Sequence, residues 1–170
     1  MEIRKATASD IEGIIDVCIQ SITTSCRADH KDSPEVLSGW LKNKTPEQVL
    51  SWISDPEHFL VVAEEESTIW GVALISVQGY LSLTYVLPST QYQGIGKNLL
   101  SAVEGYATNM GCNVVTLEST KTAKEFYERN GYIAQEGVTQ FLGMQVFPMR
   151  KNIVANKLNQ SGTPQSGAPV

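Results

Sequence analysis

The 170-residue sequence has no long hydrophobic segment. A helix that crosses a bilayer needs about 20 consecutive apolar residues, and no stretch of the chain approaches that length. The opening residues Met1–Lys5 lead into an amphipathic segment rather than into an apolar signal core. We therefore expect a cytoplasmic protein without membrane contact.

The sequence also lacks a block of basic residues. It contains 13 Lys and Arg against 18 Asp and Glu, which gives a net charge of −5. Binding of nucleic acid depends on many contacts between basic side chains and phosphates, so we expect no nucleic-acid partner. An acidic surface suits an amine-bearing substrate, but it also serves solubility alone. The net charge therefore argues against a nucleic-acid partner but does not identify a substrate.

Cysteine and histidine are scarce, with three and two residues respectively. Cys18, Cys26 and Cys112 form no C-x-x-C pair, and His30 and His58 lie in different segments. Zinc sites usually show closely spaced ligand pairs, so we expect no bound metal. An odd number of cysteines also gives no support to a disulfide framework.

The N-terminal third of the chain has the hydrophobic periodicity of helices. Ser9–Glu12 has the S-x-x-E form of a capping box, and Ile11–Ile22 carries apolar residues at helical spacing. Two Ser/Thr-Pro pairs predict short helices near 34–42 and 46–54. The polar stretch Arg27–Asp32 between them and the first helix is expected to be a loop.

Seven segments have the pattern of β-strands. They are Met1–Ala6, His58–Glu64, Thr68–Val77, Tyr80–Leu87, Asn113–Glu118, Tyr132–Gln140 and Gln145–Arg150. Two further helices are expected, one marked by apolar residues from Leu99 to Met110 and one over Thr122–Asn130. This order predicts an α+β fold with a mainly antiparallel sheet and one parallel crossover.

The chain is expected to form one domain over residues 1–151. From Asn152 onward Asn, Gln, Ser, Gly and Pro predominate and the hydrophobic periodicity is lost. We therefore expect residues 152–170 to form a flexible C-terminal tail.

The most informative segment is the loop that joins the strand Tyr80–Leu87 to the next helix. Gly94 and Gly96 stand where this helix begins, and Lys97 follows them. The first N–H groups of a helix have no intrahelical partner and carry partial positive charge, and glycine lets a phosphate approach closely. The loop is thus a candidate diphosphate site; a plain connecting turn is the alternative.

Two familiar phosphate loops do not fit this segment. A Walker A loop requires Gly at the position of Gln91 and Ser or Thr at the position of Asn98. A dinucleotide-binding fingerprint requires a third glycine where Leu99 stands. An ATPase and a dinucleotide-dependent oxidoreductase are therefore not expected.

The segment Gln91–Gly96 instead fits the pattern Gln/Arg-x-x-Gly-x-Gly/Ala and resembles the acetyl-CoA diphosphate loop of the GNAT superfamily of N-acetyltransferases. Tyr85-Val86-x-Pro88 precedes it, and Ala123–Tyr132 resembles the A-x-x-F-Y-E-x-x-G-F/Y signature of that superfamily. The resemblance covers about residues 1–150, and residues 21–40 and 138–151 are similar to its YafP-like bacterial subgroup.

This resemblance implies a GNAT-type fold and a set of site residues. Its sheet has about seven strands flanked by helices, and a splayed parallel pair of strands holds the cofactor. Main-chain groups of Tyr85, Val86 and Leu87 would bind the pantetheine arm. The residues implied at the diphosphate and beside the second strand are Gln91, Tyr92, Gln93, Gly94, Ile95, Gly96, Lys97 and Thr120.

The resemblance also implies the catalytic residues. Tyr127 matches the tyrosine that protonates the departing thiolate of CoA, a role in general acid catalysis; a core tyrosine is the alternative. Glu118 is the candidate general base, although a solvated glutamate at a strand end is equally consistent with its position. Asp29 and His30 are open as substrate contacts or as surface loop residues.

The implied activity is transfer of an acetyl group from acetyl-CoA, the co-substrate, to a primary amine of a small molecule or a peptide, by direct attack in a ternary complex. The alternative is a catalytically weak acetyl-CoA-binding sensor or interaction module, because Ser82 replaces an Asp that is frequent in the subgroup. A homodimer formed through an exposed C-terminal strand is compatible with the sequence, which does not decide it.

Overall fold

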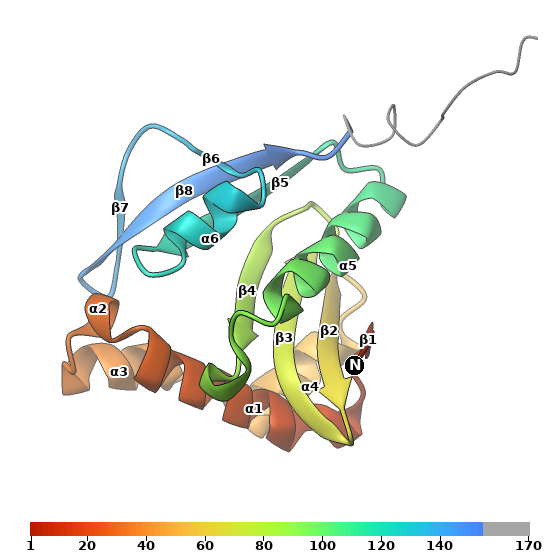
Figure 1. Cartoon of the computed structure of the whole chain (residues 1–170), viewed down its shortest axis with the longest axis horizontal. Helices are drawn as coiled ribbons and strands as arrows, with labels where there is room; N and C mark the ends of the chain where they lie inside the picture. Colours follow the sequence, from red (N-terminus) through yellow and green to blue (C-terminus); the bar gives the residue numbers. More distant parts are fainter. Residues whose placement is uncertain (155–170) are drawn as a thin grey trace, which may run out of the picture.

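The computed structural model describes residues 1–154 (Figure 1). Its strands are β1 (Glu2–Lys5), β2 (His58–Glu65), β3 (Thr68–Ser76), β4 (Leu81–Val86), β5 (Val114–Thr120), β6 (Ile133–Ala134), β7 (Thr139–Phe141) and β8 (Met144–Asn152). Its helices are α1 (Ile11–Gln20), α2 (Arg27–His30), α3 (Pro34–Leu41), α4 (Pro46–Ser54), α5 (Ile95–Asn109) and α6 (Lys124–Arg129). Shorter elements are the 3₁₀ turns η1 (Ala8–Asp10) and η3 (Pro88–Thr90) and the π-helical segment η2 (Ser21–Ser25).

The strands form two antiparallel sheets. The first has the order β1-β2-β3-β4, and the second has the order β5-β8-β6, with β7 also paired to β8. The two sheets meet where β4 and β5 run in parallel, through an isolated bridge between Tyr80 and Thr116. This arrangement confirms the predicted α+β class, and the contact between the sheets is limited to the start of β4.

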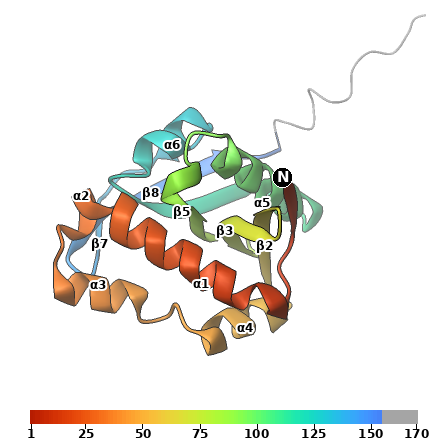
Figure 2. The same ribbon diagram turned by 60° about the horizontal axis from the view of Figure 1, so that its bottom comes forward.

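Helices cover both faces of the first sheet, as Figures 1 and 2 show. On one face, α1 and α4 pack on the sheet around a core that includes Ile14, Val17 and Leu74. On the other face, α5 packs through Leu99 and Val103. Full burial of such side chains stabilises the fold by roughly 1.5–3 kcal/mol each, so the apolar stripes read from the sequence fix the sheet between two helical layers.

The second sheet differs from the prediction at its edge. The expected single strand Tyr132–Gln140 is divided into β6 and β7, because residues 135–138 leave the ladder opposite Pro148, which accepts a hydrogen bond from Gln135 N at 2.8 Å. Gly137 has a φ of 91°, outside the range of a strand. The chain therefore has eight strands within residues 1–154 rather than about seven.

Two expectations for the N-terminal segment are wrong. The helical start is capped by Thr7 and Asp10, whose Oδ2 accepts from Thr7 N at 2.7 Å, and not by the predicted Ser9–Glu12 box. The polar stretch expected to be a loop contains α2, which continues from α1 through the π-helical segment. Lys31 ends α2 in the left-handed region, with a φ of 51°.

The described fold continues slightly past residue 151, the predicted end of the domain. Asn152 is the last residue of β8, and the side chain of Ile153 is buried in the α5 core. Ile153 N also donates to Asn113 O at 2.9 Å. The remainder of the predicted tail, residues 155–170, lies outside the described part of the chain.

Candidate active site

A cavity of about 480 Å³ lies between β4 and β5. Beyond the bridge at Tyr80, no pairing between these strands is found within residues 1–154. The walls also include the start of α5, the start of α6 and the π-helical segment η2. All the predicted site residues line the cavity except Leu87 and Gln93.

Unpaired main-chain groups of β4 face this cavity. Leu87 N donates to Trp70 O at 2.8 Å on β3. Because hydrogen-bonded and non-hydrogen-bonded pairs alternate along an antiparallel ladder, Tyr85, which lies opposite Val72, also bonds to β3. The N–H and C=O groups of Thr84 and Val86 consequently point away from β3 and toward β5.

The facing strand β5 has the same property. Ile153 N bonds to Asn113 O, and Thr116 N bonds to Gly79 O at 3.0 Å on the other side. By the same alternation, the main-chain groups of Glu118 and Thr120 point toward β4. The cavity is thus bordered on both sides by strand edges whose polar groups lack a sheet partner.

Of the three residues expected to offer main-chain groups, the pairing favours only Val86. Leu87 is engaged within the fold at both groups, since its carbonyl accepts from Thr90 N at 3.0 Å. Tyr85 contributes its side chain instead: its hydroxyl accepts from Trp40 Nε1 at 3.1 Å, and burial raises its pKa. Thr84 was missed because no motif marks it.

The start of α5 closes one end of the cavity. Gly94 is the N-cap with a φ of 81°, a conformation that suits glycine. The first intrahelical bond runs from Asn98 N to Gly94 O at 3.0 Å. The N–H groups of Ile95, Gly96 and Lys97 therefore have no intrahelical acceptor and lie at the positive end of the helix dipole.

Gly96 also has a packing role that the sequence did not indicate. A Cβ at this position would lie 2.9 Å from the ring of Phe126, so the glycine allows α5 and α6 to pack closely. At Gly94 a Cβ would meet nothing within 4 Å. The close approach made possible by Gly96 is therefore between two helices, and the loop conformation depends on Gly94.

The side chains of the predicted diphosphate loop are turned in different directions. Gln91 Nε2 donates to Ser25 Oγ at 2.8 Å and so ties the loop to η2. Tyr92 has a φ of 64° and a fully exposed side chain. Gln93 does not line the cavity, whereas Lys97 does and forms no ion pair within residues 1–154.

Tyr127 lies in the wall of the cavity on α6 and is 7% exposed. Burial raises the pKa of its phenol to about 12, and contact with Thr84 opposes that rise. The hydroxyl forms no hydrogen bond with any other residue in the described part of the chain. It is a buried, protonated donor next to the gap.

Glu118 and Thr120 lie opposite, on β5. Glu118 is exposed and Oε1 accepts from Thr139 Oγ1 at 3.2 Å. Thr120 Oγ1 accepts from Ala123 N at 3.2 Å and so shapes the turn before α6. Among the described residues that line the cavity, Glu118 carries the only carboxylate.

A sequence profile described as the acetyltransferase (GNAT) domain matches residues 26–153. The chain belongs to the GNAT acetyltransferase family. Membership in this family supports acetyltransferase activity. No curated protein sequence matches the chain.

Solved GNAT structures share the fold. A GCN5-related N-acetyltransferase from Rhodopseudomonas palustris is 20% identical with a TM-score of 0.78 and covers 89% of this chain and 94% of its own. The PaiA N-acetyltransferase from Thermoplasma acidophilum, in complex with coenzyme A, is 24% identical with a TM-score of 0.75, over 89% and 98%. An aminoglycoside 6′-N-acetyltransferase from Enterococcus faecium is 16% identical with a TM-score of 0.65, over 91% and 98%.

The other end of the cavity in this GNAT protein is built by side chains that sequence reasoning missed. Ser21 and Ser25 come from η2, Cys26 follows that segment, and Trp40 comes from α3. Burial raises the pKa of the Cys26 thiol to about 12, which keeps it protonated. The apolar stripe of the first helix gave no sign that its end turns into the site wall.

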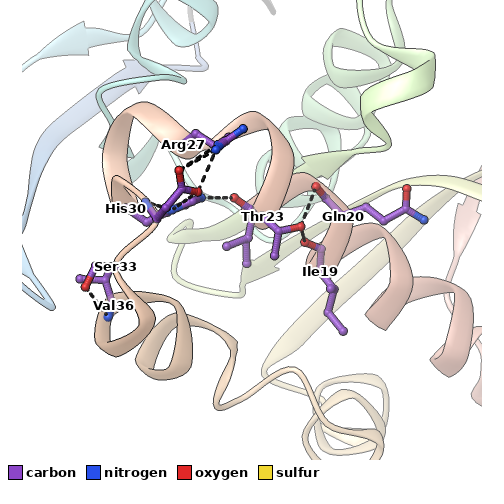
Figure 3. Close-up of polar contacts among 9 residues, drawn as sticks. Ile19, Gln20, Thr23, Arg27, His30, Ser33 and Val36 are labelled. Atoms are coloured by element: carbon purple, nitrogen blue, oxygen red, sulfur yellow. Dashed lines mark hydrogen bonds and ion pairs between the residues drawn. The ribbon is translucent and has the colours of Figure 1, made fainter.

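Figure 3 shows how this segment is held. Thr23 Oγ1 donates to the main-chain carbonyl of Ile19 at 2.7 Å. This side-chain bond to a helical carbonyl accompanies the change from α to π geometry. His30 is 1% exposed; its Nδ1 accepts from Asp32 N at 3.0 Å and its Nε2 lies 3.1 Å from Ile22 O. His30 is therefore a structural residue and not a surface or substrate-contact residue.

Asp29 connects the same segment to the loop after β5. Its Oδ1 accepts from Lys121 N at 2.8 Å, and its other oxygen accepts from the Thr122 hydroxyl. Both carboxylate oxygens are thus used within the fold. Asp29 holds α2 across the gap, and its carboxylate is not free for a substrate.

Residues 1–154 lack two further features. No group of three or more His, Cys, Asp or Glu side chains is arranged to hold a metal ion in this part of the chain. None of its helices combines the length and the hydrophobicity that a membrane span requires.

Proposed function

We propose that the protein transfers an acetyl group from acetyl-CoA to a primary amine of a small molecule or a peptide. The observation that carries this proposal is the pair of unpaired strand edges, Thr84 and Val86 on β4 and Glu118 and Thr120 on β5. A molecule with amide groups along an extended arm can bond to such edges as an added strand would. The pantetheine arm of coenzyme A has this chemistry.

The start of α5 supports the placement of the diphosphate at the end of the same gap. The N–H groups of Ile95, Gly96 and Lys97 lack intrahelical acceptors, and the helix dipole favours an anion there. Lys97 adds one positive charge in the first turn. A single extended molecule can therefore place its anionic end on α5 and its thioester near Tyr127.

The reaction proceeds by direct attack. The amine nitrogen forms a bond to the thioester carbonyl carbon and the carbon–sulfur bond breaks. Tyr127 gives its proton to the departing sulfur, because burial keeps the phenol protonated at neutral pH. The proton of the attacking amine passes to water or to Glu118. Cys26 takes no covalent part, since its raised pKa leaves it without thiolate character.

The structural relatives indicate which acceptors to test. The PaiA N-acetyltransferase was solved with coenzyme A, another relative acts on the 6′-amine of aminoglycosides, and Ard1 from Thermoplasma volcanium shares the fold with a TM-score of 0.68. Aminoglycosides are therefore the first small-molecule acceptors to test for this chain, next to other primary amines and a peptide with a free N-terminus.

One observation favours the alternative of a catalytically weak acetyl-CoA sensor or interaction module. The only carboxylate of the cavity wall within residues 1–154, Glu118, is exposed and bonded to Thr139, and Ser82 does not supply a second one. An exposed carboxylate that already accepts a hydrogen bond from Thr139 is not held toward an attacking amine. Binding of acetyl-CoA without turnover would then be the function.

Two measurements on the full chain separate these functions. Calorimetry with acetyl-CoA should show binding, and absence of heat at millimolar cofactor would overturn both. Thiol release from acetyl-CoA should exceed background with at least one member of an amine panel that includes a polyamine, an aminoglycoside and a peptide with a free N-terminus. Binding without release in any reaction would support the sensor and overturn the transferase.

The finer parts of the proposal are the relation to the YafP-like bacterial subgroup, a cytoplasmic location and a homodimer. The homodimer would use the exposed edge of the second sheet, where all three residues of β7 are exposed. A paired edge would also protect this strand from unspecific association.

A further inference from the structure

Thr84 places a buried hydroxyl in the gap without a hydrogen-bond partner. Within residues 1–154, the buried side-chain atoms that lack such a partner are Thr84 Oγ1 and Glu65 Oε2. Glu65 Oε2 forms an ion pair with the N-terminal ammonium group, so its charge is compensated. Thr84 Oγ1 has no such compensation. An unpaired buried hydroxyl destabilises a fold, and its presence calls for a reason other than stability.

The hydroxyl points toward α6 because of a bulge in β4. The register shifts so that Leu74 lies opposite Leu83 and Ile75 opposite Leu81, which leaves Ser82 as the extra residue. Beyond this bulge, Leu83 packs in the α1 core and Val86 packs in the α5 core. Side chains alternate along a strand, so Thr84 shares the face of Val86 and Tyr127.

Thr84 therefore meets the tyrosine proposed as the acid. The Tyr127 side chain contacts Thr84, but the two hydroxyls do not have hydrogen-bond geometry as they stand. A threonine hydroxyl rotates about its C–O bond and can serve as donor or acceptor. While Tyr127 is a neutral phenol, its oxygen carries no charge that a hydrogen bond from the Thr84 hydroxyl would stabilise.

We propose that Thr84 is a positioning residue whose hydroxyl donates a hydrogen bond to the Tyr127 oxygen as that tyrosine loses its proton. This role rests on the proposed transferase function. As the carbon–sulfur bond breaks, the sulfur takes the phenol proton and the negative charge moves to the Tyr127 oxygen. Thr84 stabilises that charge, and solvent returns a proton to the phenolate when the products leave.

The ionisation of Tyr127 agrees with this geometry. Burial raises the pKa of the phenol to about 12, and the contact with Thr84 acts in the opposite direction. Burial keeps Tyr127 protonated before the reaction, and a donor beside its oxygen makes the proton easier to release. A hydrogen bond to a charged group is stronger than one to a neutral group, so the bond gains most in the transition state.

The test uses two substitutions of Thr84, each made alone and with Tyr127→Phe. Thr84→Val keeps the shape and removes the hydroxyl, and it should lower kcat roughly tenfold to a hundredfold, the effect of losing one bond to a charged oxygen. The KM for acetyl-CoA should stay within about twofold of the wild-type value, because the bond forms only as the proton leaves. Thr84→Ser should restore most of kcat.

The double variant separates action through Tyr127 from direct action on the substrate. With Tyr127→Phe present, Thr84→Val should change kcat by less than about twofold, because the group on which it acts is gone. An equal loss in both backgrounds would show that Thr84 contacts the substrate directly and would overturn the proposal. Unchanged kcat in Thr84→Val would overturn it too.

Stability provides a second readout. Replacing an unpaired hydroxyl with a methyl group should leave Tm unchanged or raise it by about 2 °C. Thr108→Val is the matched control, since Thr108 Oγ1 donates to Glu104 O at 2.9 Å within α5; it should lower Tm and leave kcat unchanged. A lower Tm in Thr84→Val without rescue by serine contradicts the proposal.

A wild-type protein that binds acetyl-CoA but never releases CoA overturns the transferase function, and this role with it.

Discussion

The two ends of the gap between β4 and β5 are built in different ways. The end at α5 is made of main-chain groups, with Gly94 setting the conformation and Ile95–Lys97 offering N–H groups. The end at the π-helical segment is made of side chains, among them Ser25, Cys26 and Trp40. A main-chain site tolerates many side chains, whereas a side-chain site changes with each substitution. The fold can thus keep one cofactor while its acceptor varies.

Two hydrogen bonds connect these ends. Gln91 in the loop before α5 bonds to Ser25 in η2, and Asp29 in α2 bonds to Lys121 N after β5. The segment from η2 to α2 is thereby held to the loops that follow both splayed strands. The four predictions below test the two ends of the gap and the connection between them.

The largest effect is expected from Tyr127→Phe, which removes a hydroxyl from the wall of the gap. We expect kcat to fall by roughly ten- to ten-thousandfold, the usual range for loss of a general acid. Affinity for acetyl-CoA in calorimetry should be unchanged, because the main-chain groups proposed to bind it remain. Tyr106→Phe is the control: this ring stacks on Phe59, with centroids 4.1 Å apart, and its variant should turn over normally.

The same tyrosine makes a prediction about pH. Burial disfavours the phenolate and raises the pKa of Tyr127 to about 12, so the acid form persists at every pH below that value. Below about pH 10, Tyr127 should therefore cause no fall in kcat as the pH rises. The wild-type protein should show no alkaline decline that is absent from Tyr127→Phe. A decline near pH 8 that is specific to the tyrosine would contradict its role as a buried acid.

A smaller effect, on stability, is expected from Gly96→Ala at the cofactor end. The new methyl group would lie 2.9 Å from the Phe126 ring, so the ring or its helix must shift. Overpacking of this kind costs about 1–3 kcal/mol, to be measured as a change in the free energy of unfolding in urea.

Gly105→Ala in the same helix is the matched control. A Cβ there meets nothing within 4 Å, so this variant should gain about 0.5–1 kcal/mol from the better helix propensity of alanine. Equal stability changes in the two variants would mean that the α5–α6 contact does not need a glycine.

The smallest effect is expected at the connection between the ends. Gln91→Ala and Ser25→Ala each remove the bond of 2.8 Å between these partly buried side chains. A net hydrogen bond contributes about 0.5–1.5 kcal/mol, and the double variant should cost little more than either single one. Additive losses in urea unfolding would show that the two ends are energetically independent.

The features that were predicted correctly depend on local patterns, and those that were missed depend on distant segments. The α+β class was predicted correctly, because the helical and strand periodicities of the chain are local patterns. The strand Tyr132–Gln140 was wrong because its interruption depends on where β8 runs, and α2 was missed because its residues are polar. His30, expected at the surface, is buried by contacts with the Ile22 carbonyl and Asp32 N.

The candidate site shows the limit of local patterns most clearly. The motif Gln91–Gly96 located the loop, but it did not reveal that Gly96 also lies against the ring of Phe126. Leu87 lies in the matching motif, yet its main chain is bonded to Trp70 and Thr90. Thr84 belongs to no motif, and only the bulge at Ser82 turns its hydroxyl to Tyr127.

The sequence by itself determined the α+β order of helices and strands and the start of a helix after Gly94. Both follow from apolar spacing and from the backbone freedom of glycine, which act over a few residues. The tertiary structure alone decided which strand edges remain unpaired and which side chains meet across the gap. Those features depend on register and on the packing of segments far apart in the chain; Asp29 and Thr122, for example, are 93 residues apart.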